Sequence, residues 1–210
     1  MADEPTTTLT DDEQIELLRA VVDEIGGEAT VIAGTGTNDT RHSVELTAAS
    51  TEAGADGCLV VTPYYNRPNP AGLRAHFRTV AAATDKPIVL YNIPSRSVVN
   101  MSPALMAEIA LENENVVAVK QANDDELGPI EGLDLLAGND DVFLRTLELG
   151  GTGGILVSSQ VVGDEMRELY DAATGGDMDR AREIHERLEP VYEAMAVTSN
   201  PIPVKTALEM

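Results

Sequence analysis

The chain has 210 residues, of which 36 are acidic and 14 basic, and its formal net charge at pH 7 is −22. This length suits one or two ordinary domains, and a hydrophobic content of 43% is enough for a sizeable core. The electrostatic field of so acidic a chain argues against binding to DNA, RNA or anionic membranes. The single cysteine, Cys58, excludes a disulfide framework and a cysteine-rich metal site.

The first predicted element is an amphipathic helix over Asp11–Ile25, with Thr10 or Asp11 as its N-cap. From there apolar, β-branched runs alternate with helical patterns. Runs this apolar are typical of strands buried on both faces, as in a parallel sheet. The elements predicted next are a strand over Val31–Gly34, a helix over Thr40–Glu52, a strand over Cys58–Val61, a helix over Ala71–Ala83 and a strand over Ile88–Tyr91.

The second half of the chain continues the alternation, with one irregular gap. A helix over Pro103–Leu111 is predicted, with Ser102 as its cap and Pro103 at the first helical position. Residues 123–132 contain two glycines and a proline, so they allow little more than one turn of helix. The other predicted elements are strands over Val116–Val119, Asp134–Ala137 and Gly154–Val157, helices over Asp164–Ala173 and Asp177–Val197, and a C-terminal helix that begins at Lys205.

A repeating strand–helix unit leaves two architectures, the open doubly wound sheet and the (β/α)8 barrel. A doubly wound nucleotide binder carries Gly-x-Gly-x-x-Gly after its first strand, and the run 34–39 lacks the third glycine. The glycines of 150–154 precede their strand, so both clusters are interpreted as tight turns. Polar residues instead gather at the carboxyl ends of the strands, where a barrel enzyme builds its site: Tyr64, Tyr65, Tyr91, Asn92, Lys120, Gln121, Asn139 and Asp140.

The chain has only three lysines, which makes an elimination possible. Lys86 precedes a strand and Lys205 begins a helix after a proline-rich turn, so both are predicted to be surface residues. Lys120 ends an apolar strand, which would bury its amine at the barrel mouth. A desolvated amine loses its proton more easily and can form a Schiff base with a keto acid. A salt bridge from Lys120 to one of the many acids remains the alternative on spacing alone.

Tyrosine and arginine supply the other candidate side chains. Tyr91 ends the strand before that of Lys120, close enough for its phenol to move protons at the amine, although barrel packing accounts for a phenol there equally well. Tyr65 lies in a proline-rich loop, where exposed aromatic residues more often mark an interface. Arg96 can bind a carboxylate at the barrel mouth or make an ordinary surface salt bridge. The histidines fall on separate predicted helices and are predicted to lie on the surface, with no metal site: His42, His76 and His185.

Three motifs together resemble the dihydrodipicolinate synthase family of pyruvate-dependent class I aldolases: residues 60–68 (VVTPYYNRP), 90–96 (LYNIPSR) and 119–120 (VK). Residues 31–36, 136–140, 149–151 and 200–205 match further family segments in the same order, and the resemblance covers nearly everything from about Leu9 onward. The whole set is highly specific, whereas the lysine and tyrosine motifs alone also occur in related pyruvate aldolases.

The resemblance implies a role for each site residue. Lys120 would form the Schiff base with pyruvate, Tyr91 would be its proton-transfer partner, and Tyr65 would complete a proton relay in the site of a neighbouring subunit. Arg96 would bind the carboxylate of the second substrate, aspartate semialdehyde. Two backbone segments would help to seat pyruvate, those of Gly138 and Ile155. The family forms homotetramers from tight dimers and uses no metal or organic cofactor, so the same is expected here.

The sequence also departs from the family pattern. The family begins with two strands, a helix and a Gly-Thr-Thr-Gly-Glu motif whose threonine belongs to the relay, and residues 5–9 (PTTTL) fall where that motif has just ended. The expected fold is therefore an incomplete (β/α)8 barrel with six of its eight strands. Residues 1–160 would form this partial barrel, and residues 161–210 its last helix and a shortened C-terminal helical segment. In addition, Gln121 replaces the usual acid after the lysine, and Ser97-Val98 replaces the usual Thr-Gly after the arginine.

The expected function is condensation of pyruvate with L-aspartate 4-semialdehyde, on the lysine and diaminopimelate pathway, with activity impaired in the 210-residue chain. Two alternatives stay open: an aldolase of the same superfamily acting on 2-keto-3-deoxy sugar acids, and a non-catalytic fragment.

The sequence also carries an expectation about the protein's environment. Its apolar runs span only a handful of residues and its first four residues are not those of a secretory signal, so a cytoplasmic protein without a membrane span is expected. The acidic residues are spread along the whole chain rather than concentrated in a tail. This pattern favours adaptation to high salt, where screening relieves the self-repulsion of a compact acidic chain.

Overall fold

The computed structural model describes residues 8–210, so the acidic start at residues 1–4 and the run 5–7 lie outside the described residues. Six strands form one parallel sheet, in which each strand pairs with the next one along the chain. Within the described part of the chain, β1 and β6 are the two edges of this sheet. The strands are β1 (Ile32–Gly34), β2 (Gly57–Val61), β3 (Ile88–Asn92), β4 (Val116–Gln121), β5 (Asp134–Ala137) and β6 (Gly153–Gly154).

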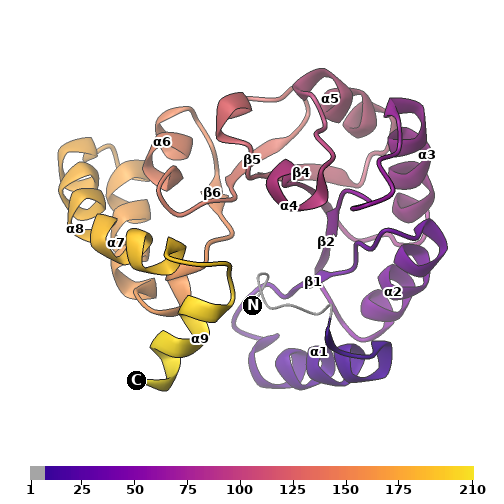
Figure 1. Ribbon diagram of the computed structural model, residues 1–210, viewed down its shortest axis with the longest axis horizontal. Helices are drawn as coiled ribbons and strands as arrows, with labels where there is room; N and C mark the ends of the chain where they lie inside the picture. The colour runs from indigo at the N-terminus through magenta and orange to yellow at the C-terminus, as the bar shows by residue number, and fades with distance from the viewer. Residues whose placement is uncertain (1–7) are drawn as a thin grey trace.

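The helices lie outside the strands along an arc, from α1 at the lower right of Figure 1, over α5 at the top, to α7 and α8 on the left. None of those in the described residues is long and apolar enough to cross a membrane. The α-helices are α1 (Asp11–Ile25), α2 (Thr40–Glu52), α3 (Pro70–Ala81), α4 (Pro94–Ser97), α5 (Pro103–Glu112), α6 (Phe143–Glu148), α7 (Gly163–Thr174), α8 (Met178–Ala196) and α9 (Ile202–Glu209). Two 3₁₀ turns are η2 (Asp124–Glu126) and η3 (Ser158–Gln160).

Helix starts follow the capping residues that the sequence offers. Thr10 accepts a hydrogen bond from the Glu13 backbone N–H, and Glu13 in turn accepts one from the Thr10 backbone, which completes a capping box at the start of α1. Ser102 caps α5 by accepting a hydrogen bond from the Leu105 backbone N–H, with Pro103 in the first turn. The predicted bounds of α1 and α2 are confirmed, and η2 is the single turn predicted within 123–132.

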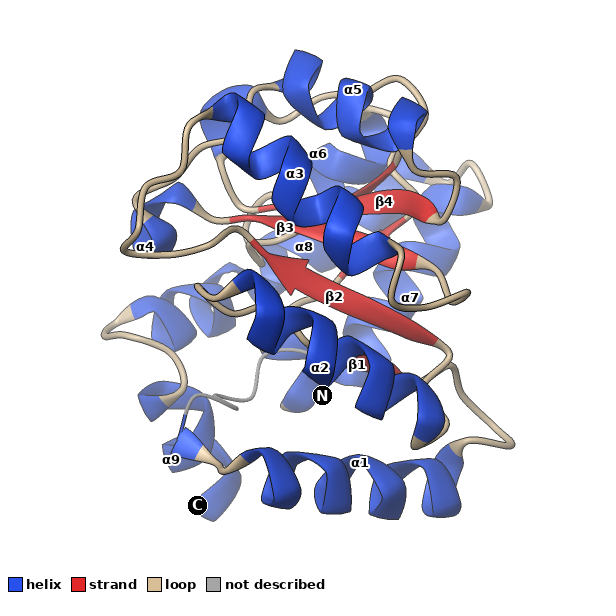
Figure 2. Cartoon of the chain, turned by 90° about the vertical axis from the view of Figure 1, so that its right-hand side faces the viewer, coloured by secondary structure: helices blue, strands red, loops and turns tan. Residues whose placement is uncertain are grey.

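Alternation along the strands sends successive side chains to opposite faces of the sheet. The outer face packs against α3 and α5, and its core includes Val60, Leu90 and Val119 among many buried residues. The inner face carries a smaller apolar cluster: Leu59, Val89 and Ala118, with Ile32, Tyr91, Leu136 and Ile155 packed against them. Both faces are therefore apolar, as the uninterrupted runs of the sequence predict. In Figure 2 the strands β2, β3 and β4 run side by side behind α2 and α3.

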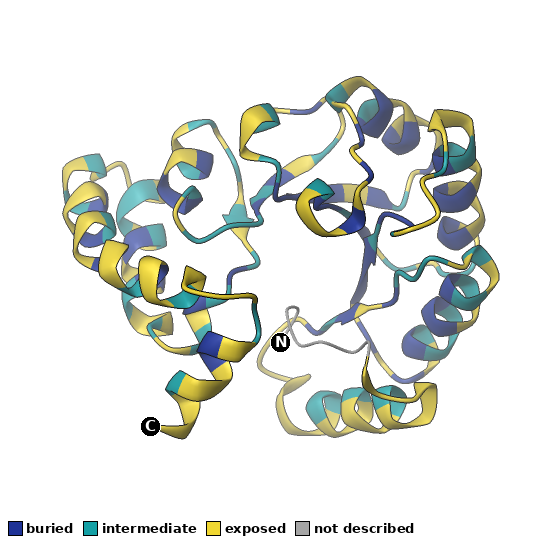
Figure 3. Ribbon diagram, viewed as in Figure 1, coloured by how far each residue is buried: buried dark blue, intermediate teal, exposed yellow. Residues whose placement is uncertain are grey.

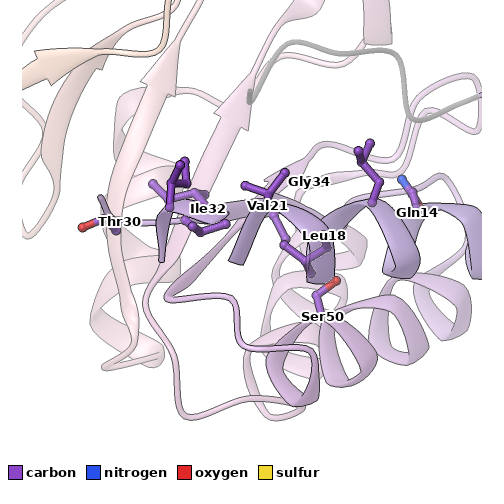
Figure 4. Close-up of a pocket in the computed structure, with 11 residues that line it drawn as sticks. Gln14, Leu18, Val21, Thr30, Ile32, Gly34 and Ser50 are labelled. Atoms are coloured by element: carbon purple, nitrogen blue, oxygen red, sulfur yellow. The ribbon is translucent and has the colours of Figure 1, made fainter. Parts of the chain in front are cut away.

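Helix α1 differs from the others because none of its residues is buried, and in Figure 3 it is coloured only as intermediate and exposed. It lies beside the edge strand β1 and leaves an apolar pocket of about 140 Å³ between them. Leu18 and Val21 from the helix and Ile32 from the strand line this pocket (Figure 4). The pocket contains none of the predicted catalytic side chains.

The sixth strand is shorter than predicted. The sequence predicts a strand over Gly154–Val157, but pairing with β5 stops at Gly154. Leu156 instead joins the apolar cluster of α6, α7 and α8, and the chain then enters η3. Two short helices, α4 and α6, are also absent from the sequence-based expectation, because segments of 4 and 6 residues carry too little periodicity to be recognised.

His76 is a second correction, because it is buried at 3% exposure although its helix pattern predicts a surface residue. It lies on α3 and faces α2, where its Nδ1 lies 2.9 Å from the Thr40 hydroxyl. Its Nε2 is buried without a partner among the described residues. Burial lowers the pKa of His76 from 6.5 to about 4, so the ring is neutral in the folded protein.

This buried histidine should make the protein sensitive to acid. An unfolded His76 takes up its proton near pH 6.5, whereas the folded one does so near pH 4, so folding opposes protonation in that window. The contribution of neutral His76 to the free energy of unfolding is fully present above pH 6.5. It falls by roughly 3 kcal/mol as the pH reaches about 4. Urea unfolding should show that the free energy of unfolding falls less between pH 7 and pH 4.5 in His76→Gln than in the wild type. The control is His42→Gln, which replaces a half-exposed histidine paired with Asp11. Equal losses of unfolding free energy in the wild type and His76→Gln would contradict the burial of His76 as the cause.

Candidate active site

Lys120 is fully buried, at 0% exposure, near the carboxyl end of β4. It shares the inner face of the sheet with Ala118, two residues earlier, since side chains alternate along a strand. The apolar residues of β4 therefore carry an amine into the interior, as the sequence predicts. Lys86 is half-buried and Lys205 is exposed. A buried amine favours its neutral, nucleophilic form, because desolvation disfavours the ammonium ion.

Tyr91 lies beside Lys120 on the neighbouring strand. The two residues are register partners of β3 and β4, and the Lys120 Nζ lies 4.3 Å from the centroid of the Tyr91 ring. The sequence predicts this proximity from the position of both residues at strand ends, and the structure brings them into contact. A phenol beside an amine can donate a proton to a leaving hydroxide and accept one from a carbon acid.

A network of side-chain amides holds the ends of these two strands together on the opposite face. Asn92 donates from Nδ2 to Gln121 Oε1 at 2.9 Å, and its Oδ1 accepts from the Met101 backbone N–H at 3.0 Å. Gln121 Oε1 also accepts from the Asn123 backbone N–H at 3.1 Å. Gln121 is fully buried, and it points away from Lys120 because it is the next residue in the strand. Gln121 therefore stabilises the ends of β3 and β4 from the outer face of the sheet.

Gly138 directly follows β5 and lies against the end of β4. Its backbone N–H donates to the Gln121 carbonyl at 2.8 Å. A Cβ at this position would lie 2.6 Å from that oxygen and 2.7 Å from the Ala122 Cβ, so only glycine fits. Ile155 sits next to this segment, half-buried, with its N–H donated to the Ala137 carbonyl at 3.0 Å. Both predicted pyruvate-seating residues thus lie on or beside β5, next to the Lys120 strand.

Gly138→Ala should separate the ends of β4 and β5. The added methyl group meets backbone rather than the tip of a flexible side chain, so the strands must move. We expect a loss of roughly 2 kcal/mol or more in the free energy of unfolding. Gly128→Ala is the matched control, because a Cβ there meets nothing within 4 Å. Chemical denaturation of the two variants measures the difference, and similar stabilities would contradict the close approach.

Arg96 lines an open pocket of about 690 Å³ at the same end of the sheet. It is exposed on α4, and its Nη2 donates to the Asn200 carbonyl at 3.2 Å. Gly138 contributes to the wall of this pocket, which therefore adjoins the β5 end. The structure accordingly brings together Arg96 and Gly138 around one pocket, and Lys120 and Tyr91 on neighbouring strands beside it.

Tyr65 is the one predicted site residue that stands apart from this group. It is 84% exposed, and its backbone takes the left-handed conformation, with φ at 69°. A non-glycine residue in that region is uncommon and strained, and it persists where the surrounding structure holds it. The loop thus projects a large aromatic ring into solvent rather than toward Lys120.

The described residues contain no group of three or more histidine, cysteine, aspartate or glutamate side chains arranged to hold a metal ion. Sequence reasoning missed Tyr192, which lines the pocket, and Ser158, which holds the pocket residue Asp140 by hydrogen bonds. Ser158 begins the 3₁₀ turn that replaces the end of the predicted sixth strand, and Tyr192 lies on the helix after it. Both residues lie far along the chain from the catalytic motifs, so no motif pointed to them. The scarcity of tyrosine was the one available hint for Tyr192.

Known proteins resemble this chain in sequence and in fold. Residues 5–210 match the model of the dihydrodipicolinate synthetase family. The chain is 43% identical over 210 residues to 4-hydroxy-tetrahydrodipicolinate synthase of Desulforamulus reducens, covering 97% of this chain and 71% of the relative. The crystal structure of dihydrodipicolinate synthase from Aquifex aeolicus matches 98% of this chain and 72% of its own, with 44% identity and a TM-score of 0.94.

A third comparison bears on assembly. A monomeric variant of dihydrodipicolinate synthase has 37% identity and a TM-score of 0.93, with 97% of this chain and 71% of the variant's chain covered. The expected fold class is confirmed by these solved structures: the six parallel strands and their helices are part of a (β/α)8 barrel.

Proposed function

Since the chain belongs to the dihydrodipicolinate synthetase family, we propose that it is a lyase that condenses pyruvate with L-aspartate 4-semialdehyde through a Schiff base on Lys120. The observation that carries this proposal is the fully buried Lys120 amine, 4.3 Å from the centre of the Tyr91 ring. The reaction would serve lysine and diaminopimelate biosynthesis, and it needs no metal or organic cofactor.

The proposed chemistry follows from the roles of these side chains. The neutral Lys120 amine attacks the keto carbon of pyruvate, and Tyr91 protonates the hydroxyl group that leaves as water. The Tyr91 phenolate then accepts a methyl proton from the resulting imine, which gives an enamine. The enamine carbon forms a bond with the aldehyde carbon of the second substrate while the aldehyde oxygen takes up that proton, and attack of the substrate's amino group on the imine carbon displaces the Lys120 amine. Arg96 holds the carboxylate of that substrate. The backbones of Gly138 and Ile155 help to seat pyruvate.

Assembly is part of the proposal. Tyr65, exposed and held in a strained conformation, is suited to insert into a neighbouring copy, where its hydroxyl completes a proton relay to Tyr91. We propose a homo-oligomer in which two chains exchange these tyrosines, and a tetramer of such dimers. The monomeric relative shows that the assembly state varies among similar proteins, so sedimentation analysis of wild type and Tyr65→Ala is the direct check. A wild-type chain that sediments as a monomer contradicts the exchange.

The acceptor aldehyde separates the proposed function from that of a 2-keto-3-deoxy sugar acid aldolase. Purified protein should consume pyruvate with aspartate semialdehyde at least about tenfold faster than with glyceraldehyde, because Arg96 offers a charge-assisted bond to a carboxylate that glyceraldehyde lacks. The reverse preference favours the sugar acid aldolase. The third reading of the sequence, a non-catalytic fragment, predicts turnover with neither acceptor and no pyruvate adduct.

The 210-residue polypeptide is expected to turn over slowly by comparison with its relatives. Its described sheet is open at β1 and β6, and the exposed edge of a parallel sheet leaves backbone groups without a neighbouring strand. Schiff-base formation at Lys120 depends on β3, β4 and the end of β5, all within the described sheet, and is expected to persist. Steady-state assay against a full-length relative measures the difference, and equal turnover contradicts the expectation.

The acidic composition supports a proposal of adaptation to high salt in the cytoplasm. With a net charge of −22, the folded chain repels itself in dilute buffer, and salt screens charges separated by more than the Debye length, about 3 Å at 1 M. The melting temperature should therefore rise by several degrees between dilute buffer and molar KCl. A flat or falling melting temperature, followed by circular dichroism, contradicts the adaptation.

A further inference from the structure

The pocket that contains Arg96 has a strongly unequal distribution of charge. One guanidinium group faces five carboxyl groups among the lining residues: Asp124, Asp140, Asp141, Glu189 and Glu193. A substrate that carries only a carboxylate gains from Arg96 but is repelled by the rest of the wall. A substrate that carries a carboxylate and an ammonium group satisfies both kinds of lining.

Asp140 is the carboxyl group that the fold holds most firmly. The Ser158 hydroxyl donates to its Oδ2 at 2.7 Å, and the Ser158 backbone N–H lies 3.2 Å from both carboxylate oxygens. Asp140 comes two residues after Gly138, so its place is fixed by the end of β5 and by η3 together. A carboxylate held by three contacts is pre-organised, and binding a ligand costs it little conformational entropy.

Tyr192 provides an independent sign that this pocket binds a polar group. It lies on α8, lines the same pocket and is only 5% exposed, yet its hydroxyl has no hydrogen-bond partner among the described residues. Buried hydroxyl groups without partners are rare in folded proteins, because each one costs free energy. Burial, and then the charges of Asp140 and Asp141, raise the pKa of the Tyr192 phenol, so it stays neutral. A neutral phenol oxygen can accept a hydrogen bond from an ammonium group.

We propose that the Asp140 carboxylate and the Tyr192 hydroxyl bind the ammonium group of the second substrate, while Arg96 binds its carboxylate, so that the pocket selects an α-amino acid aldehyde. This inference rests on the proposed function and adds the group that recognises the amine. It also predicts that a sugar-derived aldehyde fits poorly, because its hydroxyl groups carry no charge to offset the acidic wall.

Two unreactive ligands that differ in one group test the proposal. L-homoserine has the carbon skeleton, ammonium and carboxylate of aspartate semialdehyde with an alcohol in place of the aldehyde, and 4-hydroxybutyrate lacks only the amine. In calorimetric titrations of the wild type, homoserine should bind at least about tenfold more tightly than 4-hydroxybutyrate. In Asp140→Asn this ratio should fall to near one, with 4-hydroxybutyrate binding no more weakly than in the wild type.

Two further variants keep the test decisive if Asp140→Asn folds poorly. Tyr192→Phe, which removes only an unpartnered hydroxyl, should lower the homoserine affinity about threefold and leave 4-hydroxybutyrate unchanged. Asp23→Asn neutralises an exposed carboxylate on α1, outside the pocket, and should keep the wild-type ratio. A wild type that binds the two ligands equally, or binds neither, overturns the inference, as does an unchanged ratio in the Asp140 and Tyr192 variants.

Borohydride trapping of pyruvate on the wild type separates this result from the proposed function. If pyruvate is trapped on Lys120 while the two ligands bind alike, the amine recognition is wrong and the Schiff-base chemistry stands. If no adduct forms on Lys120, the proposed function fails whatever the titrations show.

Discussion

Lys120→Met is expected to abolish the pyruvate adduct that borohydride traps, and to leave the protein at least about as stable as the wild type. The amine is fully buried, so methionine, which is unbranched and similar in length, can occupy the same space without a polar group. Replacing a buried ionisable group with an apolar one of similar volume is often neutral or stabilising. The variant therefore separates chemistry from folding: adduct formation should fall by at least about a thousandfold, while the urea midpoint stays level or rises.

The other two lysines are the controls for this variant. Lys86 precedes β3 at the amino end of the sheet and Lys205 is exposed on α9, so neither has a buried amine next to a phenol. Lys86→Met and Lys205→Met should keep the wild-type yield of adduct. Undiminished trapping in Lys120→Met, measured by mass spectrometry of the intact protein, contradicts the assigned nucleophile.

Tyr91→Phe is expected to slow formation of the adduct by about a hundredfold or more, within the usual range for general acid–base catalysis. Phenylalanine keeps the ring that lies 4.3 Å from the Lys120 amine and removes only the hydroxyl. The packing of the inner face should persist, and the loss should appear in the rate rather than in the final yield, because the lysine remains.

Tyr170→Phe, on α7 and away from the sheet's inner face, is the matched control for loss of a phenol. Its rate should equal that of the wild type. Quenching the reaction with borohydride at increasing times gives both rates. Equal rates for Tyr91→Phe and Tyr170→Phe would mean that the Tyr91 hydroxyl moves no proton in this step.

Much of the fold could be predicted because its sheet is regular. Each parallel strand is buried on both faces and so appears as an unbroken apolar run, and capping residues mark the first turns of α1 and α5. The sixth strand was predicted too long because Leu156 packs with α6–α8 instead of pairing with β5. His76 was predicted at the surface because its burial depends on how α2 lies against α3, which a helical period cannot reveal.

The candidate site also has residues that the sequence could predict and residues that it could not. Lys120 and Tyr91 could be placed together because register in a parallel sheet brings strand ends to one edge. Tyr192 could not be found from sequence, since its contact with the pocket depends on how α8 folds back toward the β5 end. The outward direction of Gln121 follows from alternation along β4, yet its partners, Asn92 and the Asn123 backbone, became evident only from the structure.

The proposed chemistry depends most on which nitrogen attacks pyruvate. Reduction of the wild-type protein with borohydride in the presence of pyruvate, followed by digestion and mass mapping, identifies that nitrogen directly. The buried position of Lys120 beside Tyr91 predicts a single modified peptide that contains Lys120. Modification at Lys86 or Lys205, or no modification in a protein shown to be folded, contradicts it.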